Sequence, residues 1–320
     1  MIQERILITG AGGQLGAVLF KALQERYGKQ AVLATDLYEQ SRLKGRFEVL
    51  DATNLEALEA CVKKNSVTQI YHLAAILSAK GEQNPLKTWD VNMATFFNVL
   101  EVARQQGVGK VFYPSSIAVF GADIEPDAVP QFPNLTPTTS YGMSKVAGEN
   151  WANYYFKKYG LDVRSLRYPG VIGYQSLPGG GTTDYAVEIY HKAVKDEMFE
   201  CFLKPSTKLP MIFMDDAIRA TIELMEAPLE NISVRTSYNL ASMSFAPSEL
   251  FEAIKIFCPN FEITYKPDFR QAIADSWPNS IDDSAARKDW GWKPEYDLQQ
   301  MSEVMITQLK TYYNSISQKI

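Results

Sequence analysis

The regular alternation of short apolar runs with amphipathic helical stretches over residues 5–172 constrains the fold of this chain more than any other feature. The apolar runs that predict strands lie at residues 5–9, 31–35, 47–50, 69–73 and 110–114. Apolar side chains at helical spacing separate these runs, most clearly over residues 87–106. Parallel strands need long crossover connections, which helices of this length supply. We therefore expect an α/β fold with a Rossmann-type, doubly wound parallel sheet.

A glycine-rich loop, residues 9–16, joins the first expected strand to the first expected helix. Glycines let the backbone approach a pyrophosphate closely, and the helix N-terminus then binds its charge. Asp36 ends the second expected strand, 20 residues after Gly16, where a carboxylate would bond both ribose hydroxyls of NAD. The same carboxylate would repel the 2′-phosphate of NADP, for which Arg42 is the nearest cationic partner. The sequence therefore favours NAD as cofactor.

The composition of the chain changes after about residue 172, where glycines and prolines become frequent. This change predicts a smaller, loop-rich α/β lobe that binds the substrate. Residues 216–226 and 235–240 have the pattern of a helix and a strand that return to the first domain. We expect a NAD-binding domain of residues 1–172 plus about 216–242, and a substrate lobe of about 173–215 plus 243–320.

The composition also excludes several function classes. With 32 Lys and Arg against 37 Asp and Glu, the net charge of −5 offers no basic surplus for nucleic acid. No apolar run approaches the roughly 18 residues of a membrane span, and residues 1–10 show no signal-peptide core, so we expect a cytoplasmic protein. Three scattered cysteines and two distant histidines are too few for a zinc site, so we expect no metal.

Tyr141 and Lys145 stand four residues apart, so both side chains share one face of a helix. An ammonium beside a phenol favours the phenolate and is expected to lower the tyrosine pKa, which makes a general base. Tyr154 and Lys158 repeat the spacing, but only Tyr141 begins a helix just after the fifth strand, where a parallel sheet forms its ligand crevice. Ser116, at the end of that strand, could bond a substrate oxygen.

Five motifs in order make the resemblance of this chain to a known family specific. They are Thr9–Gly16, which matches TGxxGxxG, His72–Ala75, Pro114–Gly121, Tyr141–Lys145, which matches YxxSK, and Asp289–Pro294. Together they resemble the extended short-chain dehydrogenase/reductase superfamily of NAD-dependent epimerases, dehydratases and dehydrogenases. The resemblance implies a catalytic triad of Ser116, Tyr141 and Lys145. The cofactor residues that it and the glycine loop imply are Gly10, Gly13, Gln14, Leu15, Gly16, Asp36, Leu37, Asp51, Ala52, Leu73, Ala74, Ala75, Asn92, Tyr141, Lys145 and Tyr168.

Within that superfamily, residues 75–79, 167–172 and 178–186 resemble the L-threonine 3-dehydrogenases of the short-chain type. This implies oxidation of the β-hydroxyl of L-threonine to 2-amino-3-oxobutyrate, on the way to glycine, with Tyr141 as general base. An amino-acid substrate needs hydroxyl donors for its carboxylate and an acceptor for its ammonium. From this need and from the resemblance we expect these substrate residues: Ser78, Ser116, Tyr141, Thr182, Thr183, Asp184 and Trp277. Two alternatives stay open: residues 182–184 could simply cap a helix, and Trp277 could be a core anchor.

The main rival is a sugar-nucleotide epimerase of the UDP-hexose 4-epimerase kind. Those enzymes carry an arginine and an aromatic residue for the diphosphate where this chain has Lys208 and Pro210, although Arg235 or Arg270 could substitute. A non-catalytic NAD sensor is a further alternative, but such proteins often lack the tyrosine or the lysine. The helices at 87–106 and 141–159 carry more aromatic residues than one sheet face can bury, so we also expect a homodimer.

Overall fold

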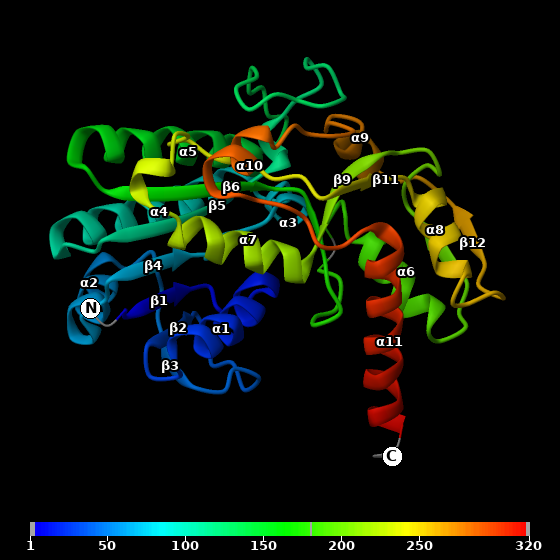
Figure 1. Cartoon of the computed structure of the whole chain (residues 1–320), viewed down its shortest axis with the longest axis horizontal. Helices are drawn as coiled ribbons and strands as arrows, with labels where there is room; N and C mark the ends of the chain where they lie inside the picture. The colour runs from blue at the N-terminus through cyan, green and yellow to red at the C-terminus, as the bar shows by residue number, and fades with distance from the viewer. Residues whose placement is uncertain (1–3, 180, 318–320) are drawn as a thin grey trace.

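A computed structural model describes residues 4–179 and 181–317 of the chain. Its centre is a seven-stranded sheet in the order β10-β6-β5-β4-β1-β2-β3, in which every neighbouring pair is parallel (Figure 1). The strands of this sheet are β1 (Ile6–Thr9), β2 (Val32–Asp36), β3 (Arg46–Val49), β4 (Gln69–His72), β5 (Lys110–Ser116), β6 (Asp162–Tyr168) and β10 (Tyr238–Asn239). The strand order reverses beside β1, as in doubly wound folds, so the predicted fold class is confirmed.

Helices cover both faces of the sheet. The five that do so are α1 (Gln14–Tyr27), α2 (Leu55–Asn65), α4 (Pro85–Gln106), α5 (Ser140–Tyr159) and α7 (Met214–Glu226). Leu19 of α1 and Leu224 of α7 share one buried cluster with the sheet, whereas Leu58 of α2, Phe96 of α4 and Ala152 of α5 share another. Each face of the sheet therefore has its own apolar core, which explains why the strands are apolar on both sides.

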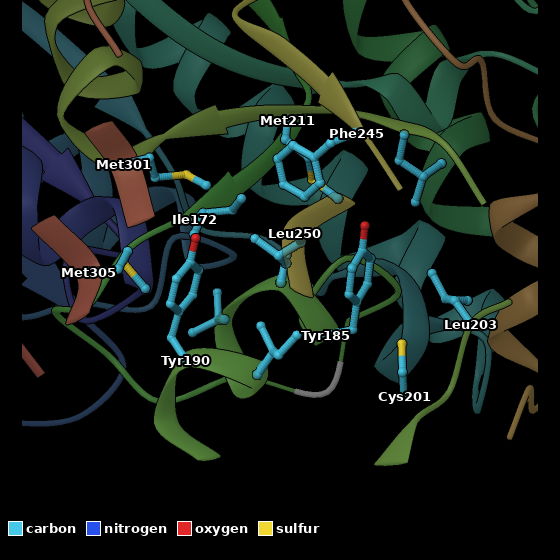
Figure 2. Close-up of a cluster of buried hydrophobic side chains, with 14 of the residues drawn as sticks. Ile172, Tyr185, Tyr190, Cys201, Leu203, Met211, Phe245, Leu250, Met301 and Met305 are labelled. Carbon is cyan, nitrogen blue, oxygen red and sulfur yellow. The ribbon is translucent and has the colours of Figure 1, made fainter. Parts of the chain in front are cut away.

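The second lobe is built from short elements and one long helix. They are β7 (Gly170–Ile172), α6 (Tyr185–Ala193), β8 (Phe199–Cys201), β9 (Leu209–Phe213), β11 (Met243–Phe245), α8 (Pro247–Lys255), β12 (Ile263–Tyr265), α9 (Arg270–Ala274) and the long α11 (Leu298–Ser317). The helix α10 (Ser284–Trp290), which precedes α11, packs against β10 of the large sheet. The strands form one sheet of order β11-β9-β7 and a β12-β8 pair. Side chains from α6, α8, β9, β11 and α11 meet in one buried cluster, to which Tyr190, Leu250 and Met301 belong (Figure 2).

After β9 the chain returns to the large sheet. α7 packs against α1, and β10 pairs with β6 through Tyr238 and Asn239. The strand is shorter than the expected 235–240 because only two residues make ladder contacts. The exact domain bounds stay a prediction. Among the described residues, no helix is long and apolar enough to cross a membrane.

Two further elements follow strands of the large sheet at its carboxyl edge. They are α3 (Ser78–Gly81), which follows β4, and a single 3-10 turn, η1 (Ile117–Val119), which follows β5; a second 3-10 turn, η2 (Leu229–Asn231), follows α7. Because parallel strands end at the same edge, the loops after β1, β4, β5 and β6 gather there. The predicted site residues come mostly from these loops.

Candidate active site

The glycine-rich loop lies tightly against the turn that follows β4. Gly10 has a φ of +71°, and a Cβ on it would lie 2.6 Å from the backbone nitrogen of Ala74. A Cβ on Gly16 would lie 2.6 Å from the carbonyl oxygen of Gly10, so only glycine fits at either position. Gly13 precedes α1 in extended conformation and brings no side-chain cap to the first turn, which begins at Gln14 and Leu15. Such an uncapped, glycine-lined N-terminus is a cradle for a pyrophosphate.

Asp36 ends β2 beside this loop. One of its carboxylate oxygens accepts a hydrogen bond from the Gly12 nitrogen and the other from the Leu37 nitrogen, both at 2.7 Å. Each oxygen keeps a second lone pair, so the carboxylate can still accept from ribose hydroxyls. Arg42 donates to the carbonyl oxygen of Gly12, which brings the guanidinium to the same loop. The carboxylate and the guanidinium from which the sequence predicts the choice between NAD and NADP therefore meet at Gly12.

Asp51 and Ala52 form a turn after β3, next to the β2 end. Asp51 Oδ1 accepts from the nitrogen and the hydroxyl of Thr53, at 2.9 and 2.7 Å, which leaves Oδ2 without a bond in this turn. Asn98 of α4 donates to the carbonyl oxygen of Ala52 at 3.0 Å. The turn is thus fixed from both sides, in the position where the resemblance predicts the adenine.

Asn92 lies on α4, and its side-chain amide forms hydrogen bonds within the protein. Its Oδ1 accepts from the nitrogen of Ile76 at 2.8 Å, and its Nδ2 donates to the Ile76 carbonyl at 3.1 Å and to Ser144 Oγ at 3.3 Å. The predicted cofactor residue therefore ties Ile76, the residue after the Leu73–Ala75 segment, to Ser144 of α5 rather than offering a free amide.

Ser116, Tyr141 and Lys145 converge where β5 ends and α5 begins. Lys145 Nζ donates to the carbonyl oxygen of Pro114 at 2.6 Å and lies 5.3 Å from the centre of the Tyr141 ring. Thr139 caps α5 by accepting from the Gly142 nitrogen at 3.0 Å. A Cβ on Gly142 would lie 2.2 Å from the carbonyl oxygen of Ala118, so this glycine lets α5 approach the strand end closely. The close approach brings the tyrosine to the serine.

The protonation of this trio differs from the prediction. Burial raises the pKa of Tyr141 to about 12, although a hydrogen bond with Ser116 opposes the rise. Burial lowers the pKa of Lys145 to about 7, although the charge of Glu149 opposes the fall. The predicted lowering of the tyrosine pKa is wrong for the protein without ligand, because withdrawal from water favours the neutral form of both groups. A neighbouring ammonium alone would lower the tyrosine pKa, but desolvation of the phenol outweighs it.

The predicted substrate loop precedes α6. Asp184 Oδ2 accepts from the backbone nitrogens of Gly179 and Gly181, at 2.6 and 2.8 Å, so one of its oxygens holds the glycine loop closed. Gly180 lies outside the described residues. Thr182 is buried, and its hydroxyl has no hydrogen-bond partner within the described chain. Thr183 packs against Gly170, where a Cβ would meet its methyl carbon at 2.8 Å.

Ser78 is the first residue of α3 and is half-buried. Its carbonyl oxygen accepts from the Glu82 nitrogen at 3.0 Å, which closes the short helix. Only Ile76 and Leu77 separate the serine from the Leu73–Ala75 segment that the glycine loop touches.

Two predicted site residues have buried side chains that point into cores. The Tyr168 hydroxyl bonds Thr221 of α7, and its ring lies in the cluster between the sheet and α7, so only its backbone is left for a cofactor. Trp277 is 9% exposed and belongs to the core of the second lobe. The structure therefore favours the core-anchor alternative for Trp277, because its ring contributes to packing. Within residues 4–179 and 181–317, no group of three or more His, Cys, Asp or Glu side chains is placed to hold a metal ion.

Comparison with known proteins agrees with this geometry. The model of the NAD-dependent epimerase/dehydratase family matches residues 6–241. The chain belongs to this family. It is similar to the mitochondrial L-threonine 3-dehydrogenase of Bos taurus, with 47% identity over 95% of this chain and 82% of the other. It is also similar to the solved holo form of a GalE-like L-threonine dehydrogenase from Cupriavidus necator, with 51% identity, a TM-score of 0.94 and coverage of 96% and 100%.

A third family member bears on assembly. It is a solved L-threonine 3-dehydrogenase from a metagenome, described as monomeric, with 50% identity and a TM-score of 0.94 over 96% of this chain and 99% of the other. The family members thus match both lobes, because the coverage extends past residue 241 to nearly the whole chain.

The sequence analysis did not predict a buried polar network that lies next to Lys145 in the present chain. Glu149 on α5 forms an ion pair with Arg167 on β6 at 2.7 Å and accepts from Ser115 Oγ at 2.6 Å. Both charged side chains are at most 2% exposed. The signal was present in the sequence, since Glu149 follows Lys145 by one helical turn, on the same face.

Proposed function

We propose that this chain is an NAD-dependent L-threonine 3-dehydrogenase, which oxidises the β-hydroxyl of L-threonine to the ketone of 2-amino-3-oxobutyrate in threonine catabolism. The observation that carries the proposal is the convergence of Ser116, Tyr141 and Lys145 at the end of β5, on the same sheet edge as the glycine cradle. The names of the bovine and Cupriavidus relatives support the choice of substrate.

The residues divide the reaction as follows. The Tyr141 phenolate takes the proton of the threonine hydroxyl as the Cβ–H bond breaks and the C=O bond forms. The glycine cradle and Asp36 would hold NAD, which would supply the acceptor for the hydride that leaves Cβ. Ser116 donates to the substrate oxygen and keeps it at bonding distance from Tyr141. Lys145 supplies a positive charge that stabilises the phenolate, which burial alone disfavours.

The cofactor has a matching set of groups along the sheet edge. We propose that Gly10, Gly13, Gln14, Leu15 and Gly16 hold the pyrophosphate and that Asp36 accepts from the adenine ribose. Both assignments are supported by the close glycine packing and by the lone pairs that Asp36 retains. We propose NAD over NADP because a carboxylate at this position repels a 2′-phosphate.

The amino-acid part of the substrate needs acceptors for its ammonium and donors for its carboxylate. We propose Ser78, Thr182 and Thr183 as donors, with the unpartnered hydroxyl of Thr182 as the strongest support. Burying a hydroxyl without a partner is costly, so a ligand that bonds it is stabilised. Asp184 keeps one carboxylate oxygen, Oδ1, outside the glycine-loop bonds and is proposed for the ammonium.

The structure offers neither the aromatic face nor a free arginine that a sugar-nucleotide epimerase would need for a diphosphate at the positions considered above. Pro210 lies in β9, opposite Ser244 of β11, and supplies no aromatic face. Arg235 pairs with Asp162 at 2.9 Å, and Arg270 pairs with Asp268 at 2.6 Å. Both possible substitutes for the missing arginine therefore already have carboxylate partners, which favours the dehydrogenase over the epimerase.

One assay separates the alternatives. Purified protein is incubated with NAD and L-threonine while NADH formation is followed, and in parallel with NAD and a UDP-hexose while the epimer is followed. We expect NADH only with L-threonine. Epimer formation would favour the rival, and no turnover of either substrate would favour the non-catalytic NAD sensor.

We also propose a homodimer formed by α4 and α5. Trp89 of α4 and Trp151 and Tyr154 of α5 are 40%, 38% and 44% exposed, which is unusual for large aromatic side chains. The metagenome relative is described as monomeric, so the mass in solution decides this for the present chain. Light scattering at micromolar concentration should give twice the mass of 36.0 kDa. We further propose a cytoplasmic location, which fractionation of the source cells would test.

A further inference from the structure

The carboxylate of Glu149 is buried in the core between α5 and the sheet, where a charged group needs full compensation. Its Oε1 accepts from Ser115 Oγ at 2.6 Å and from Arg167 Nε at 2.9 Å, and its Oε2 accepts from Arg167 Nη2 at 2.7 Å. The fork of the guanidinium thus meets both oxygens, in the strongest geometry for such a pair. A carboxylate held in this way keeps one position.

Arg167 is itself held from the opposite side. Its Nη1 donates to the carbonyl oxygen of Gln131 at 2.9 Å and to Asn239 Oδ1 at 3.1 Å. Its guanidinium also lies 5.5 Å from the centre of the Phe120 ring. The ion pair therefore joins α5, β6 and β10 into one rigid network, at the end of the strand that carries the triad serine.

This network reaches Lys145 by two routes. Glu149 follows Lys145 by one turn of α5, so both side chains lie on one face of the helix. Ser115, which donates to Glu149, stands between Pro114, whose carbonyl accepts from Lys145 Nζ at 2.6 Å, and Ser116. The negative charge of Glu149 thus stabilises the Lys145 ammonium. Through Ser115 the same carboxylate also fixes the end of β5, to which the ammonium donates its hydrogen bond.

Among the described residues, no negative charge other than that of Glu149 acts on Lys145. Tyr141 on α5 and Tyr113 on β5 present their rings to it, with Tyr113 at 4.6 Å from Nζ to the ring centre. His72 on β4 is neutral near pH 7, because burial lowers its pKa to about 3. Burial disfavours the ammonium, and Glu149 is the one group that opposes this by its charge.

We propose that Glu149, paired with Arg167, is a positioning residue that keeps Lys145 in its ammonium form and fixes the Pro114–Ser116 end of β5 for the reaction. The inference rests on the proposed function, in which the Lys145 charge stabilises the Tyr141 phenolate. It assigns a chemical role to a buried ion pair that a purely structural account would treat as packing.

The direct test measures the protonation of Lys145 without substrate. The protein is labelled with trace acetic anhydride across a pH series, and the Lys145 peptide is quantified by mass spectrometry, because only the neutral amine reacts. In Glu149→Gln the pH midpoint of labelling should fall by about one pH unit, since a nearby opposite charge is removed. In Glu149→Asp, which keeps the charge, it should stay near that of the wild type.

The kinetic test uses NAD and L-threonine. The pH above which kcat falls should move down in Glu149→Gln and stay in Glu149→Asp. Because Glu149→Gln leaves Arg167 unpaired and could fail to fold, the double variant Glu149→Met with Arg167→Met replaces the pair by apolar side chains of similar volume. It should fold and shift both midpoints in the same direction as Glu149→Gln but by less, because the positive charge of Arg167 is removed as well.

The chain offers a matched control in the second buried ion pair of β6. Asp162 and Arg164 form an ion pair at 2.7 Å, and their side chains are 9% and 0% exposed. Asp162 lies five residues before Arg167 on the same strand, a distance of roughly 16 Å. Asp162→Asn should lower stability and leave both pH midpoints unchanged. Wild-type midpoints in folded Glu149→Gln or in the double variant would overturn the inference. A wild type that forms no NADH would instead overturn the proposed function, while the labelling midpoints would still decide the role of Glu149.

Discussion

The ammonium of Lys145 donates a hydrogen bond to the carbonyl oxygen of Pro114 at 2.6 Å and thereby ties α5 to the end of β5. Tyr141 begins that helix and Ser116 ends that strand, so this one bond fixes the relative position of all three proposed catalytic side chains. The site is held by backbone as well as by side chains, which limits how far each residue can move when a ligand binds.

Replacing Tyr141 by Phe should lower turnover by about 10²- to 10⁴-fold, because the hydroxyl proton then has no general base. The ring remains, so packing and NAD affinity should change little. Initial rates of NADH formation and a fluorescence titration with NADH measure the two effects. Tyr154→Phe, at the second tyrosine with a lysine four residues later, is the control and should keep wild-type turnover. Full activity in Tyr141→Phe would rule out the assigned base.

Replacing Asp36 by Ala should weaken NAD binding by roughly 10-fold or more, because charge-assisted hydrogen bonds contribute about 1.5–3 kcal/mol. NADP binding should fall much less, since the carboxylate opposes its 2′-phosphate. Arg42→Ala, at the same loop, should leave NAD affinity near that of the wild type and weaken only NADP. Calorimetric titration with both cofactors measures this. An unchanged ratio of the two affinities in Asp36→Ala would show that the carboxylate only closes the Gly12 loop.

Replacing Gly142 by Ala should lower both stability and turnover. Inside a helix this change normally stabilises by about 1 kcal/mol, but here the new Cβ would lie 2.2 Å from the Ala118 carbonyl oxygen. The helix must shift, at a cost of about 1–3 kcal/mol. The matched control is Gly109→Ala, where the nearest atom is the Thr68 carbonyl oxygen at 3.5 Å. Urea denaturation and kcat measure the result, and equal behaviour of the two variants would contradict the close approach.

Stability should fall as pH is lowered from 6.5 toward 3, in part because of His72. Burial lowers its pKa from 6.5 to about 3, so in this window the unfolded chain binds a proton that the folded protein does not. Such a group contributes a slope of about 1.4 kcal/mol per pH unit, with stability rising as pH rises. Urea denaturation at pH 7 and pH 5 should give a smaller difference for His72→Gln than for the wild type. If the free energy of unfolding changed equally between the two pH values in both proteins, His72 would not be the group responsible.

The sequence by itself determined the fold class and predicted which residues carry the chemistry. The strands and helices of the first domain follow from hydrophobic period, and the glycine loop and Asp36 follow from a spacing that local structure preserves. The Tyr141 and Lys145 pair was readable because a helix places residues four apart on one face. All of these are properties of a few neighbouring residues.

Only the tertiary structure decided which polar groups remain free and which charges survive burial. Tyr168 and Trp277 turn out to face cores, and the Asn92 amide is used by Ile76 and Ser144, because packing partners come from distant parts of the chain. The direction of the Tyr141 pKa likewise depends on desolvation by elements that the motif does not contain. Glu149 gains its meaning only through Ser115 and Arg167, which β5 and β6 bring to it. Local patterns predict elements and motifs, whereas burial and pairing are sums over the whole fold.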